Sequence, residues 1–102
     1  LVLNACDAMS ALAPAEREIT LTTTADDGFV QIAVADRGVG ISDDQLDSVF
    51  DPFVTHRAQG LGLGLTISRS IVFAHRGRIR AENNADRGAT FRCFLPVANG
   101  QV

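Results

Sequence analysis

The chain has 102 residues, of which 46% are hydrophobic and 21% charged, and its formal net charge is −3 at pH 7. This length suits one domain, and the composition is that of a soluble globular fold and not of a disordered segment. The acidic balance offers no basic face, so nucleic acid is not an expected partner. The longest uncharged run, residues 58–68, is too short to span a bilayer, so direct membrane contact is not expected.

The first residues carry a helical pattern that ends near Leu12, ahead of Pro14. The apolar positions of this pattern fall on one helix face: Val2, Ala5, Cys6, Met9 and Leu12 or Ala13. Because no Met precedes this helix, we expect residues 1–102 to form one domain that is incomplete at its N-terminus. The two cysteines, Cys6 and Cys93, both lie in apolar stretches. They are predicted to be buried thiols in a reducing compartment, and with no signal peptide pattern the expected location is cytoplasmic.

The next segments predict an antiparallel hairpin and a short helix. Residues 18–25 and 29–35 alternate between apolar and polar side chains, and Asp26-Asp27-Gly28 between them is a turn signal. Ser42 is the predicted cap of a helix over residues 43–49, which has acidic side chains in its first turn. Residues 50–59, which include Pro52, are predicted to be irregular.

A longer helix and a second strand pair complete the predicted fold. The helix begins at Leu61 or Leu63 and runs to about His75, with Arg69 on its outer side and an apolar face made by Leu63, Ile67, Ile71 and Ala74. Residues 78–82 and 90–95 are the second pair of strands, joined through residues 83–88. The order of elements predicts a two-layer α+β sandwich, with helices packed on one face of a mixed, largely antiparallel sheet.

Three clusters follow one another along the chain and together indicate an ATP site: residues 4–8, residues 36–41 and residues 60–65. Asp36 follows a predicted buried strand and precedes two glycines, so its carboxylate is held next to backbone that a ligand can approach closely. It can accept a hydrogen bond from the exocyclic amine of adenine. Guanine has a carbonyl oxygen there, and an unsatisfied buried acceptor costs about 1–3 kcal/mol. A surface turn with left-handed glycines is the alternative interpretation.

Asn4 and the third cluster suit the phosphate end of a nucleotide. The Asn4 side-chain oxygen could be one ligand of a magnesium ion that takes its other oxygens from phosphates and water, with Asp7 near the same mouth. Gly60, Gly62 and Gly64 precede the long helix, so backbone amides and the helix dipole can face an anion, and Arg57 could reach the terminal phosphates. The cluster is neither a Walker loop nor a Rossmann fingerprint. The alternatives are a partly exposed polar helix face and an arginine without a ligand.

Five sequence boxes occur in the order found in one family: Asn4-Ala5-x-Asp7-Ala8, Asp36-x-Gly38-x-Gly40-Ile41, Phe50-Asp51-Pro52-Phe53, Gly60-x-Gly62-Leu63-Gly64-Leu65 and Gly88-Ala89-Thr90-Phe91. They resemble the catalytic, ATP-binding domain of sensor histidine kinases, over nearly the whole chain. That domain has a Bergerat-type fold, shared with the ATPases of type II topoisomerases, heat-shock chaperones and mismatch repair (the GHKL superfamily). The Phe50-Asp51-Pro52-Phe53 cluster and the short Thr55-His56-Arg57 loop favour the kinase branch over its ATPase relatives.

The resemblance implies a role for each matching residue. Asn4 would be the magnesium ligand, Asp36 the adenine anchor, and residues 50–59 the ATP lid, with Phe53 as its hinge and Arg57 where many members carry a lysine. Asn4 and Arg57 would be the catalytic residues. The implied nucleotide-binding residues are Asn4, Asp7, Ala8, Asp36, Gly38, Gly40, Ile41, Phe53, Thr55, Arg57, Gly60, Leu61, Gly62, Leu63, Gly64 and Thr90. Two positions depart from the family: Ala89 replaces a frequent threonine, and Arg76 interrupts the His-Gly-Gly turn after the long helix.

The function implied is phosphoryl transfer in two-component signalling. The domain would bind Mg-ATP and pass the γ-phosphoryl group to a histidine on a separate helical dimerisation domain, in a homodimeric parent protein, and a response regulator would then receive it. That helical domain is missing from the chain. Neither His56, in the implied lid, nor His75, at a helix end, suits the acceptor role. The alternative is an ATP-dependent regulatory or ATPase module of the same superfamily without histidine phosphotransfer.

Overall fold

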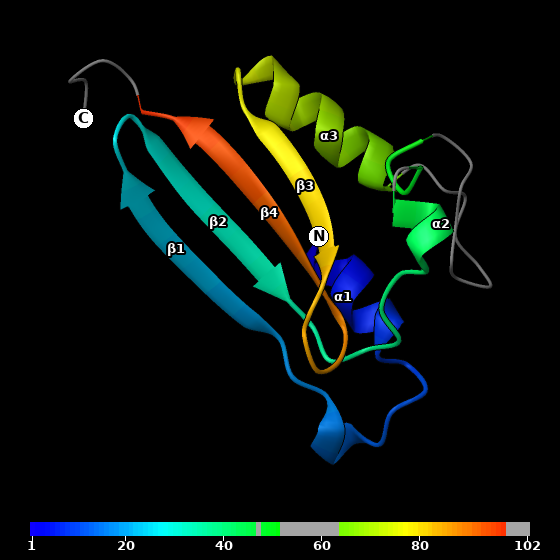
Figure 1. The fold of residues 1–102 in the computed structure, drawn as a ribbon. Helices are drawn as coiled ribbons and strands as arrows, with labels where there is room; N and C mark the ends of the chain where they lie inside the picture. The colour runs from blue at the N-terminus through cyan, green and yellow to red at the C-terminus, as the bar shows by residue number, and fades with distance from the viewer. Residues whose placement is uncertain (47, 52–63, 98–102) are drawn as a thin grey trace.

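The computed structural model describes residues 1–46, 48–51 and 64–97, and Figure 1 shows their arrangement. Three helices, one short 3₁₀ helix and four strands form the described part. In chain order these elements are α1 (Val2–Ala8), η1 (Pro14–Glu16), β1 (Thr20–Asp26), β2 (Phe29–Ala35), α2 (Asp43–Leu46), α3 (Gly64–Ala74), β3 (Arg78–Asn83) and β4 (Ala89–Pro96).

The strands form one antiparallel sheet in the order β1-β2-β4-β3 (Figure 1). The register aligns Phe91 of β4 with Val34 of β2 and Ala81 of β3, so apolar side chains share one face. Leu1 just before α1, Phe50 in the turns after α2, and Leu65 of α3 pack against the core of Val49, Ala89 and Phe91. The predicted two-layer α+β sandwich is confirmed, and the described strand pairs are all antiparallel.

The opposite face of the sheet is polar and held by side-chain pairs. The Arg80 guanidinium lies over the Phe94 ring, 5.6 Å from its centroid. On the same face Arg92 of β4 donates to the carboxylate of Glu82 on β3. These pairs connect β3 to β4 where both strands face solvent, and charged pairs at such exposed positions stabilise a fold only weakly.

The predicted hairpin is confirmed, and β1 is the exposed edge of the sheet. It begins at Thr20 and not at residue 18, and all seven of its residues are exposed, including Leu21 at 61%. At the turn, Asp27 N donates to Asp26 Oδ1 over 2.7 Å, and Gly28 takes a left-handed φ of 77°. A run of threonines suits this edge, since their β-branched side chains favour extended backbone.

The first helix ends at Ala8, earlier than the predicted end near Leu12. Residues beyond it form turns, with Leu12 N donating to Met9 O over 2.9 Å. Ala5 of α1 and Met9, just beyond the helix, are buried, and Cys6 is exposed. The prediction that both cysteines are buried is therefore wrong for Cys6 and right for Cys93. Each residue turns a helix by about 100°, which carries Cys6 away from the side that Ala5 presents to the core.

The other two helices also differ from prediction in detail. α2 ends at Leu46 and not at Val49, because residues 48–51 form turns that direct Val49 into the core. In α3 the predicted apolar face is wrong: Val72 is buried, whereas Ile67 and Ile71 are each 55% exposed. Leu65 and Val72, seven residues apart, share the side that faces the sheet, and the two isoleucines lie further around the helix. Across the described residues, no helix is long and apolar enough to cross a bilayer.

Candidate nucleotide site

Asp36 lies at the end of β2 and is only 2% exposed. Its Oδ1 accepts two backbone hydrogen bonds, from Gly38 N over 2.8 Å and from Ala89 N over 3.2 Å. Asp36 N also donates to Ala89 O over 2.9 Å. The carboxylate is thereby fixed through one oxygen, and among the described residues no donor reaches Oδ2. A carboxylate that is held through one oxygen can accept a hydrogen bond from a ligand at the other oxygen.

The loop after Asp36 packs directly on α1. A Cβ atom on Gly38 would lie 2.3 Å from Ala8 O and 2.9 Å from Ala8 Cβ, so only glycine allows this approach. Met9 continues the contact, since its Sδ accepts from Arg37 N over 3.4 Å. Asn4 is four residues before Ala8 and therefore on the same side of the helix. Its half-buried side chain is thus on the side of α1 that carries the contact with the loop.

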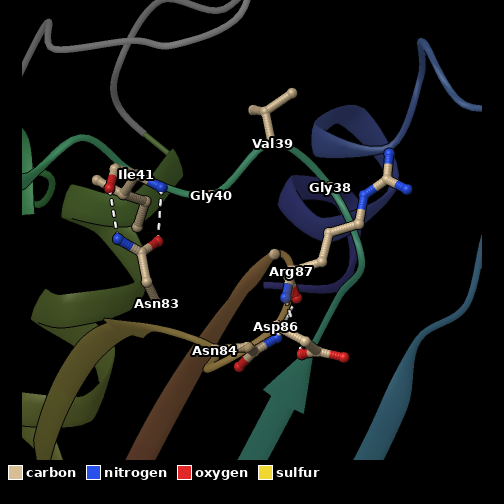
Figure 2. A pocket seen from close by; sticks show the side chains of 9 residues that line it. Gly38, Val39, Gly40, Ile41, Asn83, Asn84, Asp86 and Arg87 are labelled. Carbon is tan, nitrogen blue, oxygen red and sulfur yellow. Dashed lines mark hydrogen bonds between the residues drawn. The ribbon is translucent and has the colours of Figure 1, made fainter.

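Further along the loop, Ile41 is held by Asn83, the last residue of β3. Ile41 N donates to Asn83 Oδ1 over 2.7 Å, and Asn83 Nδ2 donates to Ile41 O over 2.6 Å (Figure 2). Gly40 lies beside this pair with a left-handed φ of 78°. The glycine loop and the β3–β4 connection are therefore joined at this point, although they are far apart in the sequence.

Asn84 and Thr90 form a second set of hydrogen bonds, next to Asp36. Asn84 Nδ2 donates to Asp36 O over 3.0 Å and to Arg87 O over 2.9 Å. The Thr90 hydroxyl donates to Asn84 Oδ1, and Thr90 is only 4% exposed. Thr90, predicted to bind the nucleotide, thus uses its hydroxyl to orient the amide that supports the end of β2.

An open polar pocket of about 360 Å³ lies between the two loops (Figure 2). Its lining comes from residues 38–41 on one side and from the β3–β4 connection on the other: Asn83, Asn84, Asp86, Arg87 and Gly88. Asp86 Oδ1 accepts from Arg87 N over 2.7 Å, and this backbone bond lowers the pKa of the Asp86 carboxyl, which stays ionised at neutral pH. Asp36 and Thr90 do not line this pocket, so it lies beside the predicted adenine anchor and not around it.

The predicted site residues divide into two groups. In one group, Ala8 of α1 contacts Gly38, and the rest lie in the loop after β2 or on β4: Asp36, Gly38, Gly40, Ile41 and Thr90. Asn4 and Asp7 lie on the same helix as Ala8. Gly64 is the first residue of α3. The remaining predictions lie outside the described residues: Phe53, Thr55, Arg57, Gly60, Leu61, Gly62 and Leu63.

Sequence reasoning missed Asn83 and Asn84, which it treated as part of a connecting turn. Asparagine is common in turns because its side chain bonds nearby backbone, so the local pattern gave no reason to expect long-range roles. The available signal was a pair of amide side chains at a strand end, next to the predicted Gly88-Ala89-Thr90-Phe91 box.

Among the described residues, no group of three or more His, Cys, Asp or Glu side chains could hold a metal ion. Magnesium needs no such group, because it usually keeps several waters and takes one or two protein oxygens together with substrate phosphates. A single half-buried amide at Asn4 is compatible with this mode of magnesium coordination.

Comparison with known proteins identifies the family and supports the fold. The family model of histidine kinase-, DNA gyrase B-, and HSP90-like ATPases matches residues 1–99. The sensor protein FixL of Bradyrhizobium diazoefficiens is 46% identical over 99 residues, which cover 97% of this chain and 19% of FixL. The chain therefore spans less than a fifth of that relative.

Solved structures show the same fold. The nucleotide-free catalytic domain of histidine kinase ThkA superposes with a TM-score of 0.76 at 31% identity, over 93% of this chain and 62% of that one. Full-length ShkA in complex with AMPPNP gives a TM-score of 0.77 at 31% identity, over 99% of this chain and 21% of that one. Both the glycine-loop geometry and these similarities lead to one assignment: the chain belongs to the histidine kinase-, DNA gyrase B-, and HSP90-like ATPase family, as an ATP-binding domain of the sensor histidine kinase type.

Proposed function

We propose that this chain binds Mg-ATP and donates the γ-phosphoryl group to a histidine on a separate dimerisation domain of the same protein. The observation that carries the proposal is Asp36, whose Oδ1 is fixed by two backbone donors at the end of a buried strand. The AMPPNP complex of the similar protein ShkA supports a nucleoside triphosphate as the ligand.

The proposed site prefers adenine to guanine. Asp36 Oδ2 accepts from the exocyclic amine of adenine, whereas guanine would place a carbonyl oxygen against the same carboxylate. The mismatch leaves two acceptors facing each other, and an unsatisfied buried polar group costs about 1–3 kcal/mol. We therefore propose ATP, and not GTP, as the substrate.

At the phosphate end, Asn4 would hold the magnesium ion through its side-chain oxygen. The ion, when bound, neutralises charge on the phosphates and helps to align the terminal group for in-line transfer. Gly64 opens α3, so the first free amides of that helix are available to an anion. Arg57, outside the described residues, is proposed as a charge-assisted donor to the terminal phosphates.

The acceptor is proposed to lie outside this chain. His75 Nδ1 lies 2.8 Å from Ile71 O at the end of α3, so one ring nitrogen is already engaged with the helix backbone. His56 falls outside the described residues. We propose instead a histidine on a helical dimerisation domain, followed by transfer to a response regulator, in a cytoplasmic portion of a homodimeric parent.

The exposed apolar side chains of α3 fit a domain with additional residues. Ile67 and Ile71 are each 55% exposed, and Val2 of α1 is 46% exposed. The chain spans 62% of the ThkA catalytic domain. We propose that further residues of the same domain cover these side chains in the parent protein.

The proposal is tested by isothermal calorimetry of the intact parent protein with Mg-ATP and Mg-GTP. Wild type is expected to bind ATP more tightly, and Asp36→Asn to lose about 1.5–3 kcal/mol of ATP binding, the worth of a hydrogen bond to a charged group. Asp26→Asn is the matched control, since it makes the same chemical change in the exposed turn at the opposite end of β2. Equal binding of ATP and GTP would overturn the proposed site.

Transfer itself is measured with ATP labelled at the γ position. The parent is expected to acquire an acid-labile label on a histidine outside residues 1–102. Binding without any such label would favour an ATP-dependent regulatory module over a kinase.

A further inference from the structure

The side chain of Asn83 binds the backbone of Ile41 in the way that one strand binds another. Its carbonyl oxygen accepts from Ile41 N over 2.7 Å, and its amide nitrogen donates to Ile41 O over 2.6 Å. Both groups of one planar amide are therefore used on one residue, 42 positions away in the sequence. We call this arrangement the Asn83 clip, and Figure 2 shows its two hydrogen bonds.

The Asn83 clip supplies backbone hydrogen bonds to the second half of the glycine loop. Gly38 is tied to Asp36 Oδ1 and packs on Ala8. Further along, no described residue other than Asn83 hydrogen-bonds the backbone of residues 39–41. Val39 is 82% exposed and so contributes little packing. Within the described residues, the clip therefore holds the backbone of this segment, while the Ile41 side chain packs against the core.

Gly40 is fitted to the same contact. Its φ of 78° is left-handed, and a Cβ atom there would lie 2.9 Å from Asn83 Oδ1. The absent side chain lets the Asn83 amide approach the loop. Gly40 thus leaves room for the Asn83 side chain, and Asn83 makes its two hydrogen bonds to the next residue, Ile41.

We propose that Asn83 is a positioning residue for nucleotide binding, which presets residues 39–41 in the conformation that receives the base. This inference rests on the proposed function, because it assigns Asn83 to the same ATP site. A loop that samples several conformations binds with an affinity reduced by the fraction of time it spends in the competent one. The clip raises that fraction before the ligand arrives, which is preorganisation.

The two bonds predict which variants weaken the clip. Asn83→Ala loses both bonds. Asn83→Asp keeps the acceptor for Ile41 N but places a carboxylate against Ile41 O, so it loses one bond and adds repulsion. Glu82→Gln is the control, because Glu82 is the neighbouring exposed residue on β3 and its partner is Arg92 of β4, away from the loop.

The test measures nucleotide affinity and loop order in the intact parent protein. For Asn83→Ala we expect the Kd for Mg-ATP and for Mg-ADP to rise by the same factor, about tenfold, since the base is common to both nucleotides. Asn83→Asp should show a similar increase, and Glu82→Gln a Kd within about twofold of wild type. Amide exchange at Ile41 should speed up in Asn83→Ala while the melting temperature stays close to that of wild type.

The outcomes separate this inference from the function on which it rests. If wild type binds ATP but Asn83→Ala binds it equally well, the positioning role is wrong and the ATP site stands. A rise in Kd that accompanies general loss of folded protein, with no selective change at Ile41, would also overturn the inference. If wild type binds no adenine nucleotide, the proposed function fails and the inference fails with it.

Discussion

Asp36 and Ala89 exchange two hydrogen bonds, one from Asp36 N to Ala89 O over 2.9 Å and one from Ala89 N to Asp36 Oδ1 over 3.2 Å. They extend the pairing of β2 with β4 by one residue beyond Ala35 and Thr90. The backbone at position 89 fixes the carboxylate, so a hydroxyl there is not needed to hold Asp36.

These bonds predict that Asp36→Asn and Asp36→Ala differ in stability. Asparagine keeps an oxygen for Gly38 N and Ala89 N, so its free energy of unfolding should stay within about 1 kcal/mol of wild type. Alanine leaves both buried donors without an acceptor, at roughly 1–3 kcal/mol for each unsatisfied group. Urea unfolding of the three proteins measures the difference. Equal stability of the alanine and asparagine variants would contradict the role assigned to Oδ1.

The end of α3 offers a stabilising substitution. Arg76 has a left-handed φ of 62°, and it occupies the position where a helix usually ends on glycine. Arg76 N donates to Phe73 O and Gly77 N to Val72 O, each over 2.9 Å, which is the Schellman pattern. Arg76→Gly should raise the free energy of unfolding by roughly 0.5–1 kcal/mol, because glycine carries no penalty at this φ. Chemical denaturation measures this change.

Gly77→Ala is the matched control for that prediction. A Cβ atom on Gly77 would lie 2.5 Å from Phe94 O and 2.8 Å from Leu95 Cδ2, so this glycine is needed for close packing and not for its φ. We expect Gly77→Ala to destabilise the protein, while the neighbouring change at Arg76 stabilises it. If both substitutions changed the free energy of unfolding in the same direction, the helix end would not have this geometry.

The two cysteines should react at very different rates. Cys6 is exposed, whereas Cys93 is buried in β4, and burial raises the pKa of the Cys93 thiol. The raised pKa keeps Cys93 protonated at neutral pH, and a thiol reacts only as the thiolate. With a thiol-specific disulfide reagent in the native protein, Cys6 should be labelled quickly and Cys93 only after unfolding. Cys6→Ser removes the fast phase if this assignment is correct.

Regular periodicity made the sheet predictable from the sequence. Alternating residues and the turn at Gly28 located β1 and β2, and the same reasoning found β3 and β4. Helix faces were less predictable, because Ile67 and Ile71 have the correct spacing for a buried face and yet lie off the side that carries Val72. Hydrophobic spacing identifies which residues share a face, but the face that packs inward depends on tertiary contacts such as that of Leu65 with the core.

The candidate site could likewise be predicted only in part from the sequence. Asp36 and the glycines could be predicted because a carboxylate at a strand end followed by Gly-x-Gly is a local pattern. The roles of Asn83 and Asn84 could not, since each depends on a partner more than forty residues away. Long-range side-chain bonds leave no periodic trace in the sequence, and turn-forming asparagines are common for local reasons.

The last prediction concerns phosphoryl transfer and uses Asn4→Asp in the intact parent protein. The aspartate keeps an oxygen at the same position but adds a negative charge beside the proposed triphosphate and its magnesium ion. Ser10→Asp is the control, because it adds the same charge at an exposed position just beyond α1. Autophosphorylation with labelled ATP should fall roughly 10- to 100-fold in Asn4→Asp, as for other changes around metal ligands, and remain near wild type in Ser10→Asp. Unchanged melting temperatures would show that the fold is retained, and a fully active Asn4→Asp protein would remove Asn4 from the mechanism.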